Sequence, residues 1–348
     1  MRILWVASQL EGHGGIGRVV ARGTRALAER GHDVHVAGPT TDADLAPFAS
    51  VVAHPWPRRF PRLLRALHFL PLARRLAPDV VHFHAALPHD ELILPARALR
   101  SAIGRPLLAA TPHSSRPYRH YRTRLGARLA DLVIVPSEWA AAHPRAAGAR
   151  HIEVVPGGVE LGPLPDFETR EPVVLVLARL VESKGIDVLL DAFDAVAATR
   201  PGWRLWIAGD GEDRAALAAH ADRLAHRDRV LFLGWLDGAE KQRVLSSAAI
   251  GVLPSRRESF GGALLEMQER ALACITSDVG GAADLASGGA TARLVPRDDA
   301  TALAEALAEL MDDTDARRKL GEQGRRHAEG FGWDAIAARY EAVYAAAR

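Results

Sequence analysis

Residues 250–266 read Ile-Gly-Val-Leu-Pro-Ser-Arg-Arg-Glu-Ser-Phe-Gly-Gly-Ala-Leu-Leu-Glu, an apolar strand that leads through a loop into a helix. The strand Ile250–Leu253 and a helix-forming run that continues to Leu272 place Glu258 in the loop at the carboxyl end of a strand. Glu266 is expected about two turns along the helix that follows. Strand, loop and helix in this order are the repeating unit of parallel α/β folds.

The loop between the two glutamates suits a ligand that carries phosphate and hydroxyl groups. Ser259 is a small polar residue of the kind that caps helices, and Gly261 and Gly262 let a ligand approach the backbone closely. A helix start with free N–H groups binds phosphate, and the carboxylates of Glu258 and Glu266 can accept hydrogen bonds from a sugar without a metal. A plain helix N-terminus with two solvated acids fits the same residues, so the segment alone leaves both interpretations open.

Apolar strand-like runs alternate with helical patterns along the whole chain. In the first half, strands are expected at Ile3–Ala7, Val34–Ala37, Val80–His84, Leu107–Ala110, Leu132–Val135 and Ile152–Val155. In the second half, they are expected at Val173–Leu177, Leu205–Ala208, Val230–Leu233, Ile250–Leu253, Cys274–Thr276 and Leu294–Val295. The alternation predicts an α/β protein with two Rossmann-like, doubly wound parallel-sheet domains. Because ligands bind beyond the carboxyl ends of such strands, we expect the two domains to face each other across a cleft.

The length of 348 residues also favours two domains. We place their boundary in Gly162–Pro172, where Gly, Pro and acidic residues cluster without apolar periodicity. The N-terminal domain is therefore expected over residues 1–165 and the C-terminal domain over residues 166–330. Residues 331–348 have apolar positions at helical spacing and predict a final amphipathic helix that packs against another part of the protein.

The composition is that of an average soluble protein, with 48% hydrophobic and 25% charged residues. The single cysteine, Cys274, excludes an intramolecular disulfide and favours a reducing compartment. Each apolar run is shorter than the roughly 20 residues that a membrane span needs. The N-terminus opens directly as a strand without a signal peptide's long apolar core. We therefore expect a cytoplasmic protein.

Charge is divided unevenly between the two halves of the chain. Residues 1–165 contain 21 Lys and Arg against 12 Asp and Glu, and the remainder contains 23 against 30. Two runs in the basic half, residues 45–78 and 92–130, have no acid and hold six and eight arginines. The arginines of the first run, interleaved with aromatic and apolar residues, are Arg58, Arg59, Arg62, Arg65, Arg74 and Arg75.

Such runs are typical of segments that contact anionic lipid headgroups, and equally of solvated helix faces in an arginine-rich chain. Peripheral contact with the inner face of the membrane therefore stays open. Nucleic acid is not an expected partner, because the second half is acidic and carries no known nucleic-acid module.

Two features of the first half point to a ligand. Gly14 and Gly15 follow the first strand and open a helix, where the backbone can approach a phosphate. This loop departs from the dinucleotide-binding fingerprint, because no acidic residue ends the second strand. His113 lies just past the strand Leu107–Ala110, on the side where the cleft is expected. His82 and His84 lack a third ligand at metal spacing, so no metal site is predicted.

The second half carries a cationic loop after its first strand. Arg179 offers a planar fork and Lys184 a mobile point charge, which are complementary ways of holding a pyrophosphate. A cation near a helix start is mildly unfavourable unless an anion binds there. Gly209 and Asp210, which follow the next strand, form a turn of the kind that lines nucleotide clefts.

Together these motifs resemble those of the retaining nucleotide-sugar glycosyltransferases of family four, which have the GT-B fold. The resemblance covers nearly the whole chain. Its most specific part is Glu258, seven residues, then Glu266, preceded by Pro-Ser and containing Ser259-Phe260-Gly261. The other matching parts are the Gly-Gly loop with Gly15, His113, Arg179 with Lys184-Gly185, and Gly209-Asp210-Gly211. The sequence departs from the family at Gly157, where asparagine is usual, and at Asp284, where glutamate is more usual.

The resemblance implies a hexosyltransferase with an acceptor-binding N-terminal domain, a donor-binding C-terminal domain and a closing helix that crosses back to the first. It implies a nucleoside-diphosphate sugar as donor, an unidentified acceptor that is lipid-linked or a glycan, and no cofactor or metal. Arg179, Lys184 and the helix start at Phe260–Gly262 would stabilise the departing diphosphate. Glu258 would hold donor-sugar hydroxyls, Glu266 the ribose diol, and His113 would orient the sugar.

The resemblance further implies retention of the anomeric configuration through front-face attack, because no carboxylate is placed as a double-displacement nucleophile. Two alternatives use related ligands without an acceptor alcohol. One is a sugar-nucleotide epimerase or phosphorylase of the same fold. The other is a non-catalytic subunit that binds a nucleotide sugar.

Overall fold

The structure is a computed structural model that describes residues 1–7, 15–39, 51–56, 65–85, 105–113 and 121–348. It divides into two compact units. The first unit comprises Met1–Gly158 together with Phe331–Arg348, and the second comprises Val159–Gly330. The division lies a few residues before the expected boundary at residue 165. The chain thus passes between the two units twice, once on each side of the second unit.

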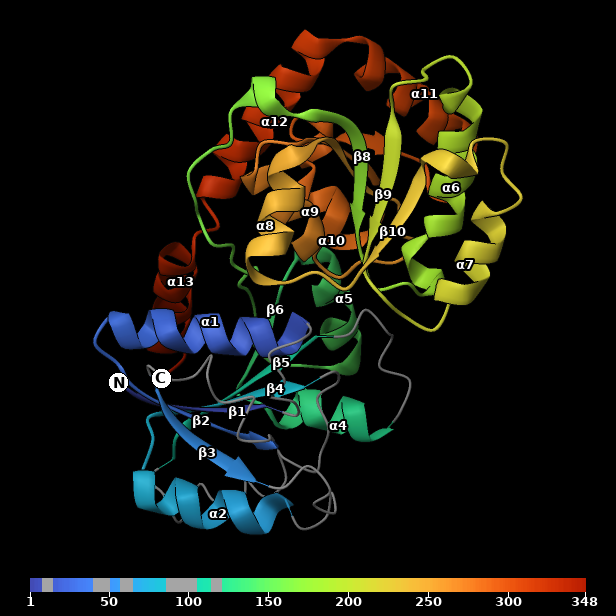
Figure 1. The fold of residues 1–348 in the computed structure, drawn as a ribbon. Coiled ribbons are helices and arrows are strands. Elements are labelled where there is room, and N and C mark those ends of the chain that lie inside the picture. The colour runs from blue at the N-terminus through green and yellow to red at the C-terminus, as the bar shows by residue number, and fades with distance from the viewer. Residues whose placement is uncertain (8–14, 40–50, 57–64, 86–104, 114–120) are drawn as a thin grey trace. The chain divides into compact units, whose positions relative to one another are not determined.

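A seven-stranded parallel sheet forms the centre of the first unit (Figure 1). Its strands run in the order β3-β2-β1-β4-β5-β6-β7. They are β1 (Arg2–Ala7), β2 (Asp33–Pro39), β3 (Val52–Trp56), β4 (Val80–Ala85), β5 (Leu107–Pro112), β6 (Leu132–Val135) and β7 (Ile152–Val154). All six strands predicted for this half are confirmed. Strand β3 was not predicted; it is a short strand at the edge of the sheet, pairs with β2 and contains Pro55. Proline within an apolar run is read as a break, and an edge strand tolerates it.

Helices cover both faces of this sheet. They are α1 (Gly15–Glu29), α2 (Arg65–Leu76), α4 (Tyr121–Leu129), α5 (Glu138–Ala147) and α13 (Trp333–Ala347). One face packs against α1 and α13, and the other against α2 and α5. The last helix of the chain, α13, therefore belongs to the first unit and lies beside α1 (Figure 1). Its residues Ile336, Ala337, Tyr340 and Tyr344 are buried there.

The second unit has a six-stranded parallel sheet in the order β10-β9-β8-β11-β12-β13. Its strands are β8 (Glu171–Leu177), β9 (Arg204–Ala208), β10 (Val230–Gly234), β11 (Ala248–Leu253), β12 (Ala273–Ser277) and β13 (Arg293–Val295). Its α-helices are α6 (Ile186–Ala197), α7 (Arg214–Ala221), α8 (Gly238–Ser247), α9 (Gly262–Glu269), α10 (Gly280–Leu285), α11 (Ala300–Asp312) and α12 (Thr314–Glu329). Each of the six predicted strands is present.

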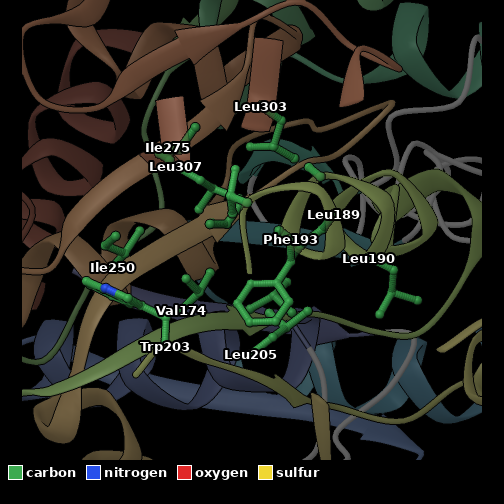
Figure 2. Close-up of a cluster of buried hydrophobic side chains, with 14 of the residues drawn as sticks. Val174, Leu189, Leu190, Phe193, Trp203, Leu205, Ile250, Ile275, Leu303 and Leu307 are labelled. Atoms are coloured by element: carbon green, nitrogen blue, oxygen red, sulfur yellow. The ribbon is translucent and has the colours of Figure 1, made fainter. Parts of the chain in front are cut away.

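Alternate strand residues of the second unit face opposite layers of helices, as pleated strands require. Val174 of β8 and Ile250 of β11 point into a core shared with α6 and α11, where Phe193 and Leu307 are fully buried (Figure 2). On the other face, the backbone of Gly251 contacts Met267 of α9 so closely that an added Cβ would lie 2.6 Å from its sulfur. Burial on both faces explains why these strands read as continuous apolar runs.

The prediction of two doubly wound parallel sheets is therefore confirmed. Within the described ranges, the structure contains no helix with the length and apolar character to cross a bilayer.

Candidate active site

The strand order of the second unit reverses between β8 and β11. In an open α/β sheet, the carboxyl ends of the two strands at such a switch point flank the ligand-binding crevice. The loop after β8 carries Arg179 and Lys184, and the loop after β11 carries Glu258. The chain therefore brings the predicted cations and the first predicted carboxylate to one end of the sheet, although about 75 positions separate them in the sequence.

Lys184 and Glu258 are in direct contact across this switch point. The Lys184 Nζ atom lies 2.5 Å from Glu258 Oε2. The hydroxyl of buried Ser255 lies 3.4 Å from the same oxygen. The two charged side chains are only 20% and 13% exposed. Each side chain is thus held in place by the other and keeps a small exposed fraction.

Gly185 explains why the two loops can approach so closely. It ends the short 3-10 turn Glu182–Lys184 in a left-handed conformation, with φ 63°, and begins α6. A Cβ at this position would lie 2.1 Å from the carbonyl oxygen of Pro254. Only glycine therefore fits, and it sets the position of Lys184 immediately before it.

Arg179 lies in a loop whose backbone is hydrogen-bonded to the end of β9 and to the turn that follows it. The amide of Ala178 donates to Ala208 O at 3.1 Å, and that of Leu180 donates to Asp210 O at 2.9 Å. Gly209 has φ 146°, and a Cβ there would lie 1.8 Å from Ala178 O. The Arg179 side chain is exposed and makes no ion pair with any acid in the described part of the chain.

Glu266 forms a second carboxylate–ammonium pair. Its Oε2 lies 3.0 Å from Lys241 Nζ, with the side chains 25% and 17% exposed. Lys241 belongs to α8. It was not predicted as a site residue, because a lone lysine in a helix has no distinguishing sequence pattern. Glu266 is the fifth residue of α9, so the expected position two turns along the helix was wrong. The helix starts later than its apolar pattern suggested.

The helix start itself also corrects one expectation. The N-cap of α9 is Gly261, with φ 98° and no side-chain hydrogen bond, so Ser259 is not the capping residue. Ser259 and Phe260 instead lie against the first turn of α10, where a Cβ on Gly281 would be 2.4 Å from Ser259 O. A Cβ on Gly262, the first residue of the helix, would meet no described atom within 4 Å. The start of α9 therefore has open space beside its backbone.

In the first unit, His113 follows β5 directly and its amide donates to Ala85 O at 2.9 Å. Its Nε2 lies 3.1 Å from Nδ1 of buried His84. Burial lowers the pKa of His113 to about 4, so the ring is neutral at pH 7. Burial lowers the pKa of His84 well below its usual range as well.

The glycine loop of the first unit is only partly described. Gly15 is the first residue of α1, and a Cβ there would meet no described atom within 4 Å. Gly14 lies outside the described residues. The same is true of part of each acid-free arginine run, including Arg58, Arg59 and Arg62.

No three His, Cys, Asp or Glu side chains gather as metal ligands do in the ranges that the structure covers. The polar groups at the end of the second sheet are instead ammonium, carboxylate and backbone N–H groups. Such a set can bind an anion and several hydroxyl groups at the same time.

Two family models match consecutive parts of the chain. Residues 165–327 match the model for glycosyl transferases group 1. Residues 13–162 match the model for Glycosyltransferase Family 4. The two matches together span nearly the whole chain and meet within a few residues of the division between the two units.

Curated relatives of comparable length are glycosyltransferases. Glycogen synthase of Mycobacterium tuberculosis is 28% identical, over 96% of this chain and 92% of its own. N-acetyl-alpha-D-glucosaminyl L-malate synthase of Bacillus anthracis is 26% identical, over 95% of this chain and 93% of its own.

Solved structures agree on the fold. Sucrose-phosphate synthase of Thermosynechococcus elongatus matches with a TM-score of 0.79 at 23% identity, over 99% of both chains. HepE of Anabaena, in complex with UDP and glucose, matches with a TM-score of 0.83 at 18% identity, over 99% of this chain and 100% of its own. The GT-B fold that was expected from the motifs is confirmed by these neighbours.

Proposed function

Since the chain belongs to the group 1 and family 4 glycosyltransferases, we propose that it moves a hexosyl group from a nucleoside-diphosphate sugar to an acceptor hydroxyl, with retention at the anomeric carbon. The observation that carries this proposal is the contact of Lys184 with Glu258 at the switch point of the second unit. A diphosphate needs the ammonium group, and a sugar hydroxyl needs the carboxylate. The second unit is accordingly the donor-binding domain.

The proposed reaction uses the positive groups to stabilise the leaving group. The bond between the anomeric carbon and the diphosphate oxygen breaks, and a bond from that carbon to the acceptor oxygen forms on the same face. The acceptor proton passes to the departing phosphate oxygen, so a glycoside and a nucleoside diphosphate result. Arg179, Lys184 and the N-terminus of α9 stabilise the negative charge that develops on the diphosphate.

The two glutamates then have different roles. Glu258 accepts hydrogen bonds from the donor sugar, and Glu266 accepts them from the ribose diol. Each carboxylate forms an ion pair with a lysine, at 2.5 Å and 3.0 Å. The paired lysines hold both carboxylates in place for a neutral polyol. The resemblance assigns His113 the role of orienting the sugar, which a His113→Ala variant would test.

Acceptor binding is proposed for the first unit, whose excess of arginine suits an acceptor with anionic groups, such as a lipid-linked glycan. Peripheral membrane contact through this unit is part of the same proposal. UDP-glucose is a suitable first donor to test, because the structural neighbour HepE is known in complex with UDP-glucose.

Incubation of the full chain with UDP-, GDP- and ADP-hexoses tests the proposed activity. Transferases commonly transfer slowly to water, so we expect release of nucleoside diphosphate and free hexose from one donor. An isomerised sugar nucleotide would indicate an epimerase, and phosphate-dependent release of a sugar phosphate would indicate a phosphorylase. A thermal shift with nucleotide but no product, even with added glycan and lipid-linked acceptors, would favour a binding subunit.

A further inference from the structure

Arg256, two residues before Glu258, joins three loops at the carboxyl ends of the strands of the second unit. Its Nη1 and Nη2 atoms donate to the two carboxylate oxygens of Asp187 at 2.9 and 2.7 Å. Nη1 also donates to Glu182 O at 2.7 Å. Its Nε donates to Asp298. Asp187 and Glu182 belong to the segment after β8, Arg256 follows β11, and Asp298 follows β13.

The backbone of Arg256 also joins the segment after β8 to the loop after β11. The amide of Arg256 donates to Ser183 O at 2.9 Å, so the residue before Lys184 is bound to the residue two before Glu258. On the other side of the loop, Glu258 O accepts from the amide of Gly281 at 3.0 Å. The loop that carries Glu258 is therefore fixed at both of its edges.

Arg256 carries a positive charge and is paired with two carboxylates, those of Asp187 and Asp298. The side chain is 23% exposed, and Asp187 lies in the first turn of α6, where a carboxylate is favoured by the helix dipole. Burial alone would raise the pKa of Asp187, but the hydrogen bonds from Arg256 lower it. An arginine can hold two carboxylates and a carbonyl in one plane, whereas a lysine offers a single point charge.

Asp298 provides an independent sign that this contact is constrained. Its φ of 59° lies in the left-handed region, which residues other than glycine rarely adopt. Such a conformation persists where the surrounding structure enforces it, and it is concentrated at functional sites. Here it lies at the loop that Arg256 binds.

We propose that Arg256 is a positioning residue of the donor site, which holds Lys184 and Glu258 at their working separation through Asp187, Asp298 and Ser183. This inference rests on the proposed function for its catalytic consequence. A reacting group that is misplaced by about 1 Å can lose on the order of 100-fold in rate. Loss of the guanidinium would remove the side-chain bonds to Asp187, Asp298 and Glu182 O and leave the loop after β11 held by its backbone bonds alone. The loop would loosen and, with it, the carboxylate of Glu258.

Substitution of Arg256 in the full chain tests the proposal, with a matched arginine as control. Arg200 also forms a two-pronged pair with an aspartate, Asp312, in the same unit. It follows α6 and precedes β9, at the amino ends of the strands, whereas Arg256 lies at their carboxyl ends. The variants R256Q and R200Q therefore remove the same kind of interaction at the two ends of the sheet. R256K keeps a charge that can reach one carboxylate but not both.

Two readouts are combined. Hydrogen exchange of the free protein at the peptides that cover residues 182–187 and 254–261 reports the loop contact without any ligand. Hydrolysis of UDP-glucose, or of whichever hexose donor the wild type turns over, gives kcat and KM.

We expect R256Q to speed exchange in both peptides and to lower kcat/KM on the order of 10- to 100-fold. R200Q should match its change in thermal stability without either effect, and R256K should recover part of both. Equal exchange and equal kcat/KM in R256Q and R200Q would overturn the proposal. If the wild type turns over no donor, the proposed function fails, and the exchange comparison still decides whether Arg256 holds the loop.

Discussion

The hydroxyl of Tyr344 lies 2.5 Å from Nδ1 of His82, which joins the last helix of the chain to the central sheet of the first unit. Trp5 Nε1, which can only donate, lies 3.1 Å from the same hydroxyl. On the other side of the ring, His82 Nε2 lies 2.7 Å from Thr111 Oγ1. This chain of hydrogen bonds runs from α13 to β5, two residues before His113.

Tyr344→Phe should destabilise the first unit, because it removes the hydroxyl that pairs with two buried nitrogen atoms, Trp5 Nε1 and His82 Nδ1. The expected loss in the free energy of unfolding is about 1–3 kcal/mol. Urea unfolding, followed by tryptophan fluorescence, measures it. Ala342→Ser, an exposed change in the same helix, should stay within about 0.5 kcal/mol. Equal midpoints for the two variants would mean that the hydrogen bonds of Tyr344 contribute nothing.

Acid should destabilise the protein well before its carboxylates titrate. An unfolded histidine is protonated below about pH 6.5, whereas folded His113 has a pKa of about 4 and those of His82 and His84 are also well lowered. The unfolded chain therefore binds more protons between these values, so stability falls as the pH is lowered from about 6.5 towards 4.

Urea midpoints at pH 7.5, 6.5, 5.5 and 4.5 follow this loss. The carboxyl group of Asp187, whose pKa is lowered below the ordinary 3.8, remains ionised over most of this range. His113→Gln removes one of the titrating groups and should flatten the decrease. A wild-type midpoint that does not change between pH 6.5 and 4.5 would contradict the burial of these rings in neutral form.

Gly209→Ala should be strongly destabilising, because the new Cβ would lie 1.8 Å from Ala178 O and φ is 146°. Strain and overlap together are expected to cost about 3 kcal/mol. Gly202→Ala is the matched control in the same unit, since a Cβ there meets nothing within 4 Å in the described structure. Thermal unfolding of both variants measures the difference. A stable Gly209→Ala protein would show that the two loops need not touch.

Lys184→Gln and Glu258→Gln should separate diphosphate binding from sugar binding. We expect Lys184→Gln to weaken UDP binding and to lower donor turnover on the order of 100-fold or more. Glu258→Gln should bind UDP as well as the wild type or better, because Lys184 loses a competing partner. Its turnover of UDP-glucose should still fall roughly 10- to 100-fold.

Calorimetry with UDP and hydrolysis of UDP-glucose provide the two measurements. Lys319→Gln, which removes an exposed lysine of α12, is the control for the change in net charge. Near-normal turnover in either Lys184→Gln or Glu258→Gln would remove the role proposed for that residue.

Most of the fold could be predicted from the sequence, because apolar runs such as Val173–Leu177 are buried on both faces and have no other stable place. The exception was β3, whose Pro55 breaks the pattern and is tolerated only at the edge of the sheet. The loops of the candidate site were also found, since Arg179, Lys184 and the glutamate pair stand out by residue type and by their resemblance to a known family. The start of α9 was placed wrongly, because its cap is a glycine in a left-handed conformation and not Ser259.

By itself, the sequence determined the alternation of strands and helices, the two sheets and the identity of the charged loop residues. These depend on local periodicity and on residue type, which neighbouring positions reveal. Only the tertiary structure decided which charges meet: Lys184 with Glu258, Lys241 with Glu266, and Arg256 with Asp187. The partners in these pairs are 25 to 74 positions apart in the sequence, and no local pattern links them. They meet because parallel strands bring the segments that follow them to the same end of the sheet.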